Sequence, residues 1–346
     1  MRVDSVGVAV PSRRITNDDI LDLLTEHSPA TPPELLRVYR KVVECLLSRA
    51  GSMVRYVRDL AASESAGDLV VTAMEDALRT ADMRANDIDL VIYCGVGRGF
   101  LEPANAYFFA QRLGMRSACF DIVDACLSWV RSLELSYELL RGGRYQHIMV
   151  VNGEFNTQHG YPDNFRVRSV EQIEYTFPTY TIGEAATATV LSCSSATWRF
   201  AYQSFPDLAD LCAIPLPGYE NFVEPNGRLG RNGMNQLTAY GRELLDGARK
   251  HLMSVLSEVV DDLLEPDIYI PHVATDAIRF AASCASEVPA EKIYNGIFPH
   301  YGNVVSASIP MGIRMALSEG RLRRGDDVVL CPASAGMAFG AARFTY

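Results

Sequence analysis

The chain has 346 residues, of which 48% are hydrophobic and 21% charged, and its formal net charge is −10 at pH 7. This composition is typical of a globular protein that buries a large core. The negative charge argues against nucleic acid as a partner, because phosphate binding needs a basic surface. No apolar run is long enough to cross a membrane, and residues 1–19 lack the apolar stretch of a signal peptide. We therefore expect no membrane partner and a cytoplasmic location.

The eight cysteines are scattered without CxxC pairs, which predicts neither a metal site nor a disulfide framework. We expect no bound cofactor either. Two short basic stretches, 165–168 ("FRVR") and 321–325 ("RLRRG"), are candidates for docking an acidic carrier protein. Such runs more often form a solvated surface.

In chain order, hydrophobic periodicity predicts strands alternating with helices, which indicates an α/β fold. A capped helix with Thr16 or Asn17 as N-cap follows the first strand, and residues 31–62 are predicted mostly helical with a break at Gly51. The other elements of this part of the chain are a strand in 3–11, a helix in 66–83, a strand in 87–97 and a helix in 103–115.

The pattern then repeats. The strand in 87–97 resembles 266–275, and each is followed by a helix. The stretches 118–151 and 297–330 are both predicted to contain a strand that ends in a break of small residues, a long helix that closes with a Gly-Arg turn, and another apolar strand. We predict two copies of one α/β unit, residues 1–190 and 191–346, with Cys126 and Asn303 in equivalent places.

This equivalence suggests chemistry, because ligands of open α/β layers gather where strands end and helices begin. Cys126 lies at or next to the start of a helix, where exposed N–H groups favour a thiolate. Packing of the two units about a pseudo-twofold axis would bring Cys126 and Asn303 together, and His272 at the end of a predicted strand would join them. A thiol, an imidazole and a carboxamide suit acyl transfer.

The motifs "FDIVDACLSW" (120–129), "IPHVAT" (270–275), "YGNVVSASIP" (301–310) and the C-terminal 321–344 resemble those of ketoacyl synthase III enzymes of the thiolase superfamily. The resemblance covers most of the chain. It implies a duplicated five-layer α/β/α/β/α sandwich, active as a homodimer. It also implies that an acyl thioester of coenzyme A or of an acyl carrier protein is the substrate.

The resemblance also implies roles for individual residues. Cys126 attacks the thioester, the backbone N–H groups of Cys126 and Ala335 bind the oxyanion, and His272 and Asn303 stabilise the enolate of a second thioester. Phe100, Trp129 and Thr275 are the predicted substrate contacts, although Trp129 could instead pack beneath its helix.

The sequence also departs from the family pattern. Ala335 stands in "PASAG" (332–336), where the family has a glycine-rich loop, and Thr275 and Ala277 replace the usual Asn and Arg. These changes leave open whether coenzyme A or a carrier protein brings the acyl group.

Glu102, in "GFLEPANA" (99–106), stands where ketoacyl synthase III usually has Phe. A Glu followed by Pro resembles the head-to-head condensing enzymes of bacterial olefinic hydrocarbon synthesis, in which the Glu reaches the partner subunit's site as a base. A base is needed when no carbon dioxide is lost, because the α-proton must then be removed from a plain acyl thioester. A solvent-exposed loop carboxylate is the alternative interpretation.

We therefore predict an acyltransferase that condenses two thioesters through acyl-Cys126, in fatty-acid-like or polyketide secondary metabolism. Head-to-head and decarboxylative malonyl condensation stay open at this point. The alternatives are transfer of the acyl group to oxygen or nitrogen of a small molecule, and an inactive subunit that shapes a partner's tunnel.

Overall fold

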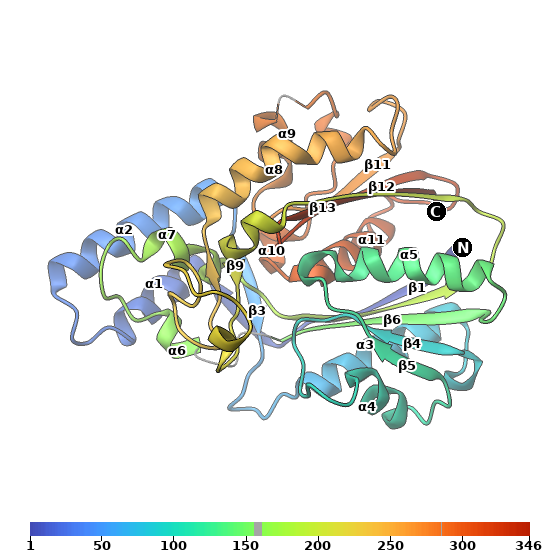
Figure 1. The fold of residues 1–346 in the computed structure, drawn as a ribbon, viewed down its shortest axis with the longest axis horizontal. Helices are drawn as coiled ribbons and strands as arrows, with labels where there is room; N and C mark the ends of the chain where they lie inside the picture. The colour runs from blue at the N-terminus through green and yellow to red at the C-terminus, as the bar shows by residue number, and fades with distance from the viewer. Residues whose placement is uncertain (156–160, 285) are drawn as a thin grey trace.

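The computed structural model describes residues 1–155, 161–284 and 286–346, and its centre is a pair of β-sheets (Figure 1). One sheet has the order β1-β7-β6-β4-β5 and the other the order β11-β12-β13-β8. The strands of the first sheet are β1 Arg2–Ala9, β4 Leu90–Tyr93, β5 Ala118–Asp121, β6 His147–Glu154 and β7 Ala185–Ser192. Those of the second are β8 Trp198–Ser204, β11 Ile268–His272, β12 Asp327–Ser334 and β13 Ala338–Thr345. The chain therefore passes from one sheet to the other between β7 and β8.

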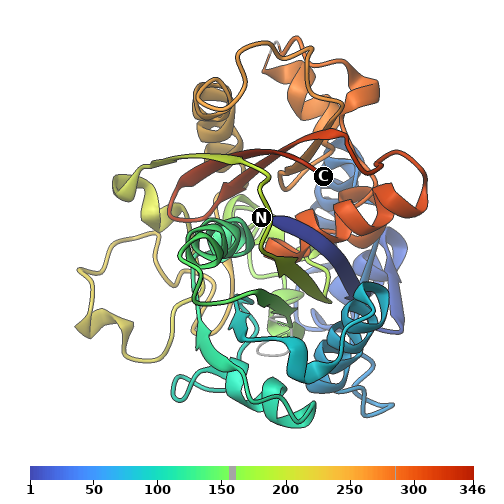
Figure 2. The ribbon, with the colours of Figure 1, turned by 90° about the vertical axis from the view of Figure 1, so that its right-hand side faces the viewer.

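Helices lie in three layers around these sheets (Figure 2). The pair α5 and α11 lies between the sheets, α3 and α4 cover the outer face of the first sheet, and α8 and α9 cover the outer face of the second. Their bounds are α3 Ala66–Ala81, α4 Asn105–Arg112, α5 Ser128–Arg141, α8 Gly241–Leu256, α9 Ala277–Ser283 and α11 Ser308–Ser318. The predicted α/β/α/β/α sandwich is confirmed.

The strands are apolar on both faces because both faces of each sheet are covered by helices. Every residue of β7 and seven of the eight in β6 are buried. The core between the sheets is built on Trp129 and Leu133 of α5 and on Met311 and Ile313 of α11. Burying each of these side chains contributes roughly 1.5–3 kcal/mol. The two helices that lead into the site are thus held rigidly from both sides.

The N-terminal region adds a helical pair beside the sandwich. Helices α1 (Asn17–Glu26) and α2 (Pro33–Ala50) pack together, and β2 (Arg13–Thr16) pairs with β3 (Val54–Val57). Thr16 is the N-cap of α1 in a capping box with Asp19, as predicted. The prediction for 31–62 is wrong beyond Ala50, because Gly51 ends α2 with φ 77° and the chain then extends into β3.

Shorter elements complete the structure. The short strands β9 and β10 pair antiparallel, so that Cys212 lies opposite Ala239. The remaining elements are α6 Tyr161–Asn164, α7 Ile173–Thr176, α10 Phe298–Tyr301, β9 Cys212–Ala213, β10 Thr238–Ala239 and the 3₁₀ turns η1 Ala85–Asp87, η2 Ala125–Leu127, η3 Phe177–Thr181, η4 Pro206–Leu211, η5 Tyr219–Asn221, η6 Ala290–Lys292 and η7 Val305–Ala307. In the part of the chain that the structure describes, no helix combines the length and the apolar character needed to cross a membrane.

The duplicated pattern is present, but the predicted match between Cys126 and Asn303 is wrong by three residues. A 3₁₀ turn precedes each central helix, η2 before α5 and η7 before α11. The first residue of each turn has a positive φ, 45° at Ala125 and 49° at Val305, which is unusual for residues with a side chain. The shared geometry aligns Cys126 with Ser306. The sequence comparison missed this because small residues fill both breaks and permit several registers.

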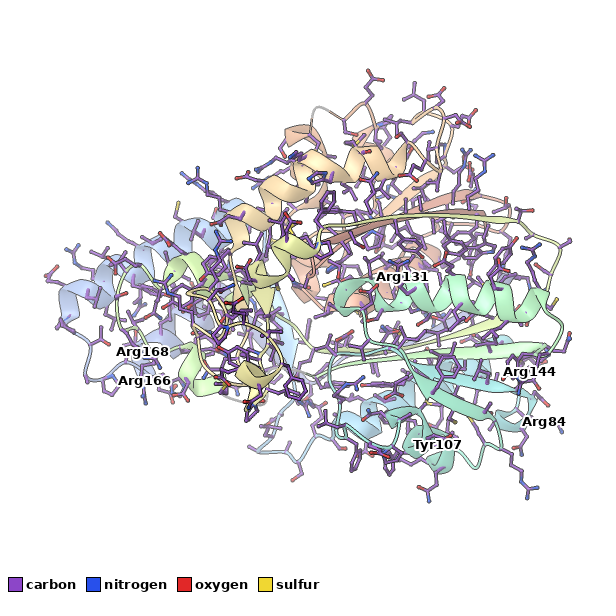
Figure 3. All side chains as sticks on the ribbon, viewed as in Figure 1. Arg84, Tyr107, Arg131, Arg144, Arg166 and Arg168 are labelled. Carbon is purple, nitrogen blue, oxygen red and sulfur yellow. The ribbon has the colours of Figure 1, made fainter. Side chains whose placement is uncertain are left out.

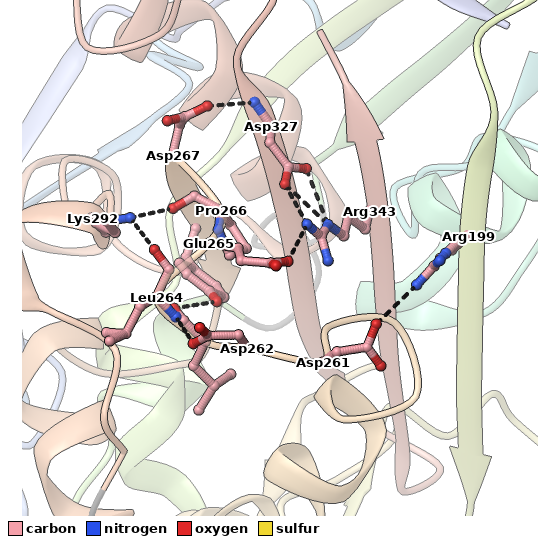
Figure 4. Close-up of polar contacts among 12 residues, drawn as sticks. Arg199, Asp261, Asp262, Leu264, Glu265, Pro266, Asp267, Lys292, Asp327 and Arg343 are labelled. Carbon is pink, nitrogen blue, oxygen red and sulfur yellow. Dashed lines mark hydrogen bonds and ion pairs between the residues drawn. The ribbon is translucent and has the colours of Figure 1, made fainter.

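The second sheet has two different ends. At the end where β11 and β12 begin, charged groups are paired with one another (Figure 4). Asp327 accepts hydrogen bonds from Arg343, which also pairs with Glu265 at 3.0 Å, and the Asp327 N–H donates to Asp267. His272 lies at the opposite end of β11. The charges in Figure 4 therefore anchor the strands and are remote from the functional end.

Candidate active site

Cys126 lies in the middle of η2, two residues before α5 begins. Leu127 next to it is fully buried and anchors the turn in the core between the sheets, whereas Cys126 is half-buried. Asp124 binds Arg131 of α5 at 3.0 Å, and its backbone N–H donates to Ser128 Oγ. The turn is thus fixed on both sides of the thiol, and the strained Ala125 backbone is held in place by its surroundings.

A cavity of about 580 Å³ opens at Cys126. Its wall includes His272, Asn303, Thr275 and Ala335, the residues that the sequence predicted to meet there. The wall is mostly apolar, with contributions from α7, α8, β9 and β10 such as Ile173, Leu244, Cys212 and Ala239. An apolar cavity with a few polar groups at one end suits a molecule with an alkyl chain and a reactive carbonyl.

His272 is the last residue of β11 and is only 4% exposed. It pairs in register with Pro332 of β12, so the C-terminal ends of the two parallel strands meet at the cavity. Burial lowers the pKa of His272 to about 4. The imidazole is therefore neutral at pH 7, with one nitrogen that donates and one that accepts.

Asn303 enters the site from the loop before η7. Its Oδ1 accepts a hydrogen bond from the Val305 N–H at 2.9 Å, which fixes the orientation of the side-chain amide and leaves the Nδ2 group as the donor. Its backbone N–H donates to the Thr181 carbonyl at 2.8 Å. Gly302 makes this path possible, since it has φ 75° and a Cβ there would lie 2.4 Å from the Thr181 oxygen.

Ala335 lies in the loop between β12 and β13, directly beside the thiol. Its backbone N–H is hydrogen-bonded to Cys126. Ser334 Oγ also donates to the Asp124 carbonyl at 3.3 Å, which ties this loop to the turn that carries Cys126. A backbone N–H at this place can serve as one donor of an oxyanion hole even though the residue is not glycine.

The resting site is electrically neutral at its centre. Burial raises the pKa of the Cys126 thiol, and the nearby acidic groups of Cys212 and Glu154 raise it further, whereas the Ala335 N–H lowers it. The expected helix-start effect on the thiolate is thus opposed by burial and by neighbouring acids. We conclude that Cys126 is a protonated thiol beside a neutral His272 when the cavity is empty.

Comparisons with known proteins agree with this geometry. The family model for the C-terminal part of 3-oxoacyl-[acyl-carrier-protein (ACP)] synthase III matches residues 262–346, which carry His272, Asn303 and Ala335. The beta-ketoacyl-[acyl-carrier-protein] synthase III of Alkalilimnicola ehrlichii is 29% identical over 363 residues, covering 100% of this chain and 99% of the relative. The chain is a ketoacyl synthase III-like protein of the thiolase superfamily. It is accordingly an acyltransferase.

Solved structures share the whole fold of this ketoacyl synthase III-like chain. Xanthomonas campestris OleA with bound lauric acid and lauroyl-CoA superposes with a TM-score of 0.81 at 20% identity, covering 99% of this chain and 98% of that one. The 3-oxoacyl-[acyl-carrier-protein] synthase III of Aquifex aeolicus has a TM-score of 0.78 at 21% identity, covering 100% and 99%. These likenesses establish the architecture of both halves.

Three predicted site residues of the ketoacyl synthase III-like chain lie outside this cavity. Trp129 is fully buried in the core and donates its Nε1–H to Thr189 Oγ1 at 3.1 Å, so the alternative of packing beneath the helix is correct. Phe100 is 47% exposed and stacks on Phe108. Glu102 is exposed on the same loop and does not line the cavity of its own chain. Thr275 does line it, although its Oγ1 donates to the Ala50 carbonyl at 3.2 Å.

The basic groups at the cavity were missed by sequence reasoning. We call Arg49 of α2, Arg242 and Arg249 of α8 and Arg279 of α9 the rim arginines; all four line the cavity and are exposed. They come from three helices, so no basic run in the sequence reveals them. By contrast, the predicted stretch 165–168 does not line the cavity, and Figure 3 shows Arg166 and Arg168 beside α6. In the stretch 321–325, Arg324 is bound to the Val3 carbonyl.

Two further acidic groups near Cys126 were also missed. Cys212 lines the same cavity, and Glu154 at the end of β6 is fully buried. Neither stands in a motif; only the fold brings them beside the nucleophile. Among the described residues, no group of three or more His, Cys, Asp or Glu side chains is arranged to hold a metal ion.

Proposed function

We propose that the protein forms an acyl thioester on Cys126 and condenses the acyl group with a second thioester, in a Claisen-type reaction of fatty-acid-like chemistry. The observation that supports this most strongly is that Cys126, His272, Asn303 and Ala335 all line the same, mostly apolar cavity. Each of these groups has the chemistry that one part of the reaction needs.

In the first step, Cys126 Sγ attacks the thioester carbonyl. Neutral His272 accepts the proton of the Cys126 thiol and then donates it to the thiolate of the departing carrier. The new S–C bond replaces the old one, so the carrier leaves as a free thiol. The backbone N–H groups of Cys126 and Ala335 stabilise the oxyanion, and loss of one such donor typically costs about 10²–10³ in rate. Because His272 is neutral at pH 7, it is available as a base.

In the second step, a second thioester forms an enolate that attacks the acyl-Cys126 carbonyl, and Cys126 is released. Asn303 Nδ2 and the N–H of neutral His272 donate hydrogen bonds to the enolate oxygen. The Val305 N–H holds the Asn303 amide with its donor group available for this purpose. Two neutral donors suit this step because they stabilise developing negative charge without first binding an anion.

We further propose that the acyl group arrives on a phosphopantetheine arm. The rim arginines supply positive charge at the cavity on a chain whose net charge is −10. Arg249 is paired with Asp246 at 2.6 Å, and Arg279 donates to the Ser48 carbonyl at 3.3 Å. Arginine binds phosphate oxygens through its planar fork of donors. The rim therefore favours thioesters of coenzyme A or of an acyl carrier protein.

The role of Glu102 depends on a second copy of the chain. In one chain Glu102 is exposed on a loop whose neighbours Phe100 and Leu101 are 47% and 81% exposed. An apolar exposed loop of this kind supports the proposal that the protein is a homodimer in which this loop contacts the partner. We propose that Glu102 then removes the α-proton of a plain acyl thioester, so that head-to-head condensation needs no loss of carbon dioxide. The resemblance of the Glu-Pro motif to that of head-to-head condensing enzymes supports this role of Glu102, and such a reaction would belong to secondary metabolism.

The test is mass spectrometry of the intact protein after incubation with acyl-coenzyme A. An acyl adduct that maps to Cys126 and is absent in Cys126→Ser supports the proposal and excludes an inactive subunit. Product analysis then separates condensation from transfer to oxygen or nitrogen, since only condensation forms a new carbon–carbon bond. Release of labelled carbon dioxide from a malonyl thioester identifies decarboxylative condensation, and a β-keto product that is lost in Glu102→Gln identifies the head-to-head reaction.

A further inference from the structure

A second, much smaller cavity adjoins the reaction cavity at His272, and we call it the small cavity. Its volume is about 20 Å³, and His272, Val273, Thr275 and Asn303 line both spaces. The rest of its wall comes mainly from β11, from α10, from the start of α11 and from the loop 294–297. The His272 ring therefore borders both cavities. A space of this size suits one water molecule, because a single water needs about 10–15 Å³.

Two buried polar side chains line the small cavity without a hydrogen-bond partner among the described residues. They are His272, which is 4% exposed, and Ser308, the first residue of α11, which is 5% exposed. Burial is the only influence that shifts the pKa of His272, so no hydrogen bond to the ring opposes it. Buried polar groups without a partner cost free energy, and a third polar group between them would remove this cost.

The other polar side chains in this wall already form hydrogen bonds; they are Thr275, Tyr294, Asn295 and, through Oδ1, Asn303. Asn295 uses both ends of its amide, because Oδ1 accepts from the Ala277 N–H at 2.9 Å and Nδ2 donates to Asp276 at 3.0 Å. The Nδ2 group of Asn303 is the donor assigned above to the enolate. The capacity for new hydrogen bonds in the small cavity therefore lies at His272 and Ser308.

The two roles proposed for His272 need opposite placements of its single ring proton. While the nitrogen at the reaction cavity accepts the Cys126 proton, the other nitrogen carries an N–H; while the first nitrogen donates to the enolate, the other has a lone pair. A backbone N–H or carbonyl at the second nitrogen would satisfy only one of these forms. Water and a hydroxyl group both donate and accept, so a water bound to Ser308 would satisfy both forms.

We propose that one water molecule occupies the small cavity and bridges Ser308 Oγ to the ring nitrogen of His272 that borders this cavity. Ser308 is accordingly a positioning residue, which contacts no substrate and acts through the water on the orientation and the tautomer of the imidazole. This role rests on the proposed function of His272 in both steps. The presence of the water does not depend on it.

The direct test is a high-resolution crystal structure of the protein without substrate. One water should lie within about 2.5–3.2 Å of both a His272 ring nitrogen and Ser308 Oγ. A dry small cavity, or a water that contacts only one of the two groups, would overturn the proposal. This observation needs no turnover, so it stands apart from the test of the proposed function.

Kinetics test whether the water positions His272. Ser308→Ala removes one partner of the water and should lower kcat of condensation by about threefold to tenfold with little change in KM, since one hydrogen bond is lost and the reacting groups remain. Ser308→Val should lower kcat further, because its methyl groups take the space of the water. The matched control is Ser318→Ala at the exposed end of α11, where the hydroxyl donates to the Met315 carbonyl, and it should keep full activity.

The tautomer of His272 separates positioning from a general effect on the fold. With isotopically labelled histidine, the ring-nitrogen resonances that disappear in His272→Gln report the balance between the two neutral tautomers. This balance should shift in Ser308→Val and stay unchanged in Ser318→Ala, whereas a loss of stability alone would leave it unchanged in both. An unshifted balance in Ser308→Val would overturn the positioning role.

If circular dichroism shows that Ser308→Val is unfolded, the same measurement on Ser308→Ala decides in its place. Failure of the proposed function has a different signature. The bridging water and the shift of the tautomer balance would then still be observed, but acyl-coenzyme A would give neither an adduct on Cys126 nor a condensation product.

Discussion

The turns η2 and η7 have similar backbones, but their second residues face different surroundings. Each starts with a residue of positive φ and leads into a helix between the two sheets. In η2 the second residue is Cys126, half-buried at the cavity, whereas in η7 it is Ser306, buried against Glu154. The strained turn therefore occurs twice in the fold, and only in the copy with the thiol does the second residue line the cavity.

The comparison also explains where the other groups come from. The first half supplies the thiol, and the second half supplies His272, Asn303 and the Ala335 N–H. The second turn cannot react, because its hydroxyl is bound in a network and faces away from the cavity. It instead places Asn303, three residues earlier, at the cavity wall. In the proposed reaction, the first half carries the acyl group and the second half stabilises the charge that develops on the substrates.

The largest expected effect on activity comes from replacing the thiol, which is the main difference between the two turns. Cys126→Ser should reduce acyl transfer by about 10³–10⁶-fold, because a hydroxyl in this site is a far weaker nucleophile than a thiol. The measurement is product formation from acyl-coenzyme A together with the adduct mass. Cys193→Ser, at an exposed cysteine outside the cavity, is the matched control and should keep full activity. Equal activity of both variants would contradict the assignment of Cys126.

A smaller effect is expected from the groups of the second half. His272→Ala and Asn303→Ala should each lower condensation by about 10²–10³-fold, since each removes a donor to the enolate. The Asn303 variant should still form the acyl adduct on Cys126, because the oxyanion donors of the first step are backbone N–H groups. Single-turnover acylation and steady-state condensation, measured on the same preparation, separate the two steps. Loss of acylation in Asn303→Ala would argue against this division of labour.

The pH dependence of stability sharpens the comparison, because the two buried groups titrate in opposite directions. The folded pKa of His272, about 4, lies below its ordinary value of 6.5, so unfolded chains bind the proton first and stability falls as pH drops from about 6.5 to 4. The folded pKa of Glu154, about 7, lies above its ordinary 4.5, so its contribution is lost as pH rises from about 4.5 to 7. The effect of His272 is about 3 kcal/mol.

Urea unfolding at pH 7 and at pH 4.5 measures both contributions. When the pH is lowered from 7 to 4.5, the free energy of unfolding of His272→Gln should fall by less than that of the unmodified protein. The free energy of unfolding of Glu154→Gln should fall by more. Variants that shift in the same direction would show that at least one of the two groups is not neutral in the folded protein at pH 5.5.

The smallest effect is expected at the rim. Arg242→Gln and Arg279→Gln should raise KM for acyl-coenzyme A by about threefold to tenfold with little change in kcat, because in the proposed reaction these arginines bind the carrier and take no part in the bond-forming step. The effect should shrink as salt is added. Arg199→Gln is the control, since Arg199 is exposed and pairs with Asp261 away from the cavity (Figure 4). A change in kcat alone would contradict a binding role.

Much of the fold could be predicted from the sequence, because its signals are local. β4 and β11 are buried on both faces, so they appear in the sequence as continuous apolar runs. Thr16 and Asp19 form the capping box that marks the start of α1. The helical prediction for 31–62 failed at β3, whose four residues are too few to show a period. Strand pairing with β2, which no local pattern records, decides the structure there.

For the site, motifs placed Cys126, His272, Asn303 and Ala335 at one cavity, but the motifs could not supply what surrounds them. Glu154, Cys212 and the rim arginines are brought to the site by long-range packing alone. Trp129 was wrongly predicted as a substrate contact because it is close in sequence to Cys126. In the structure, the helix directs its side chain into the core. Sequence reveals reacting groups better than it reveals their electrostatic environment.

Part of the cavity wall comes from segments that lie outside the duplicated sandwich core. The end of α2, α7 and the short β9 and β10 ladder line the cavity together with α8 and α9 of the sandwich, whereas the thiol, imidazole and carboxamide lie at strand ends and turns of the core. If the cavity holds the acyl chain as proposed, insertions in these peripheral segments can change the length and shape of the chain that fits. The groups proposed to form the bond would stay in place.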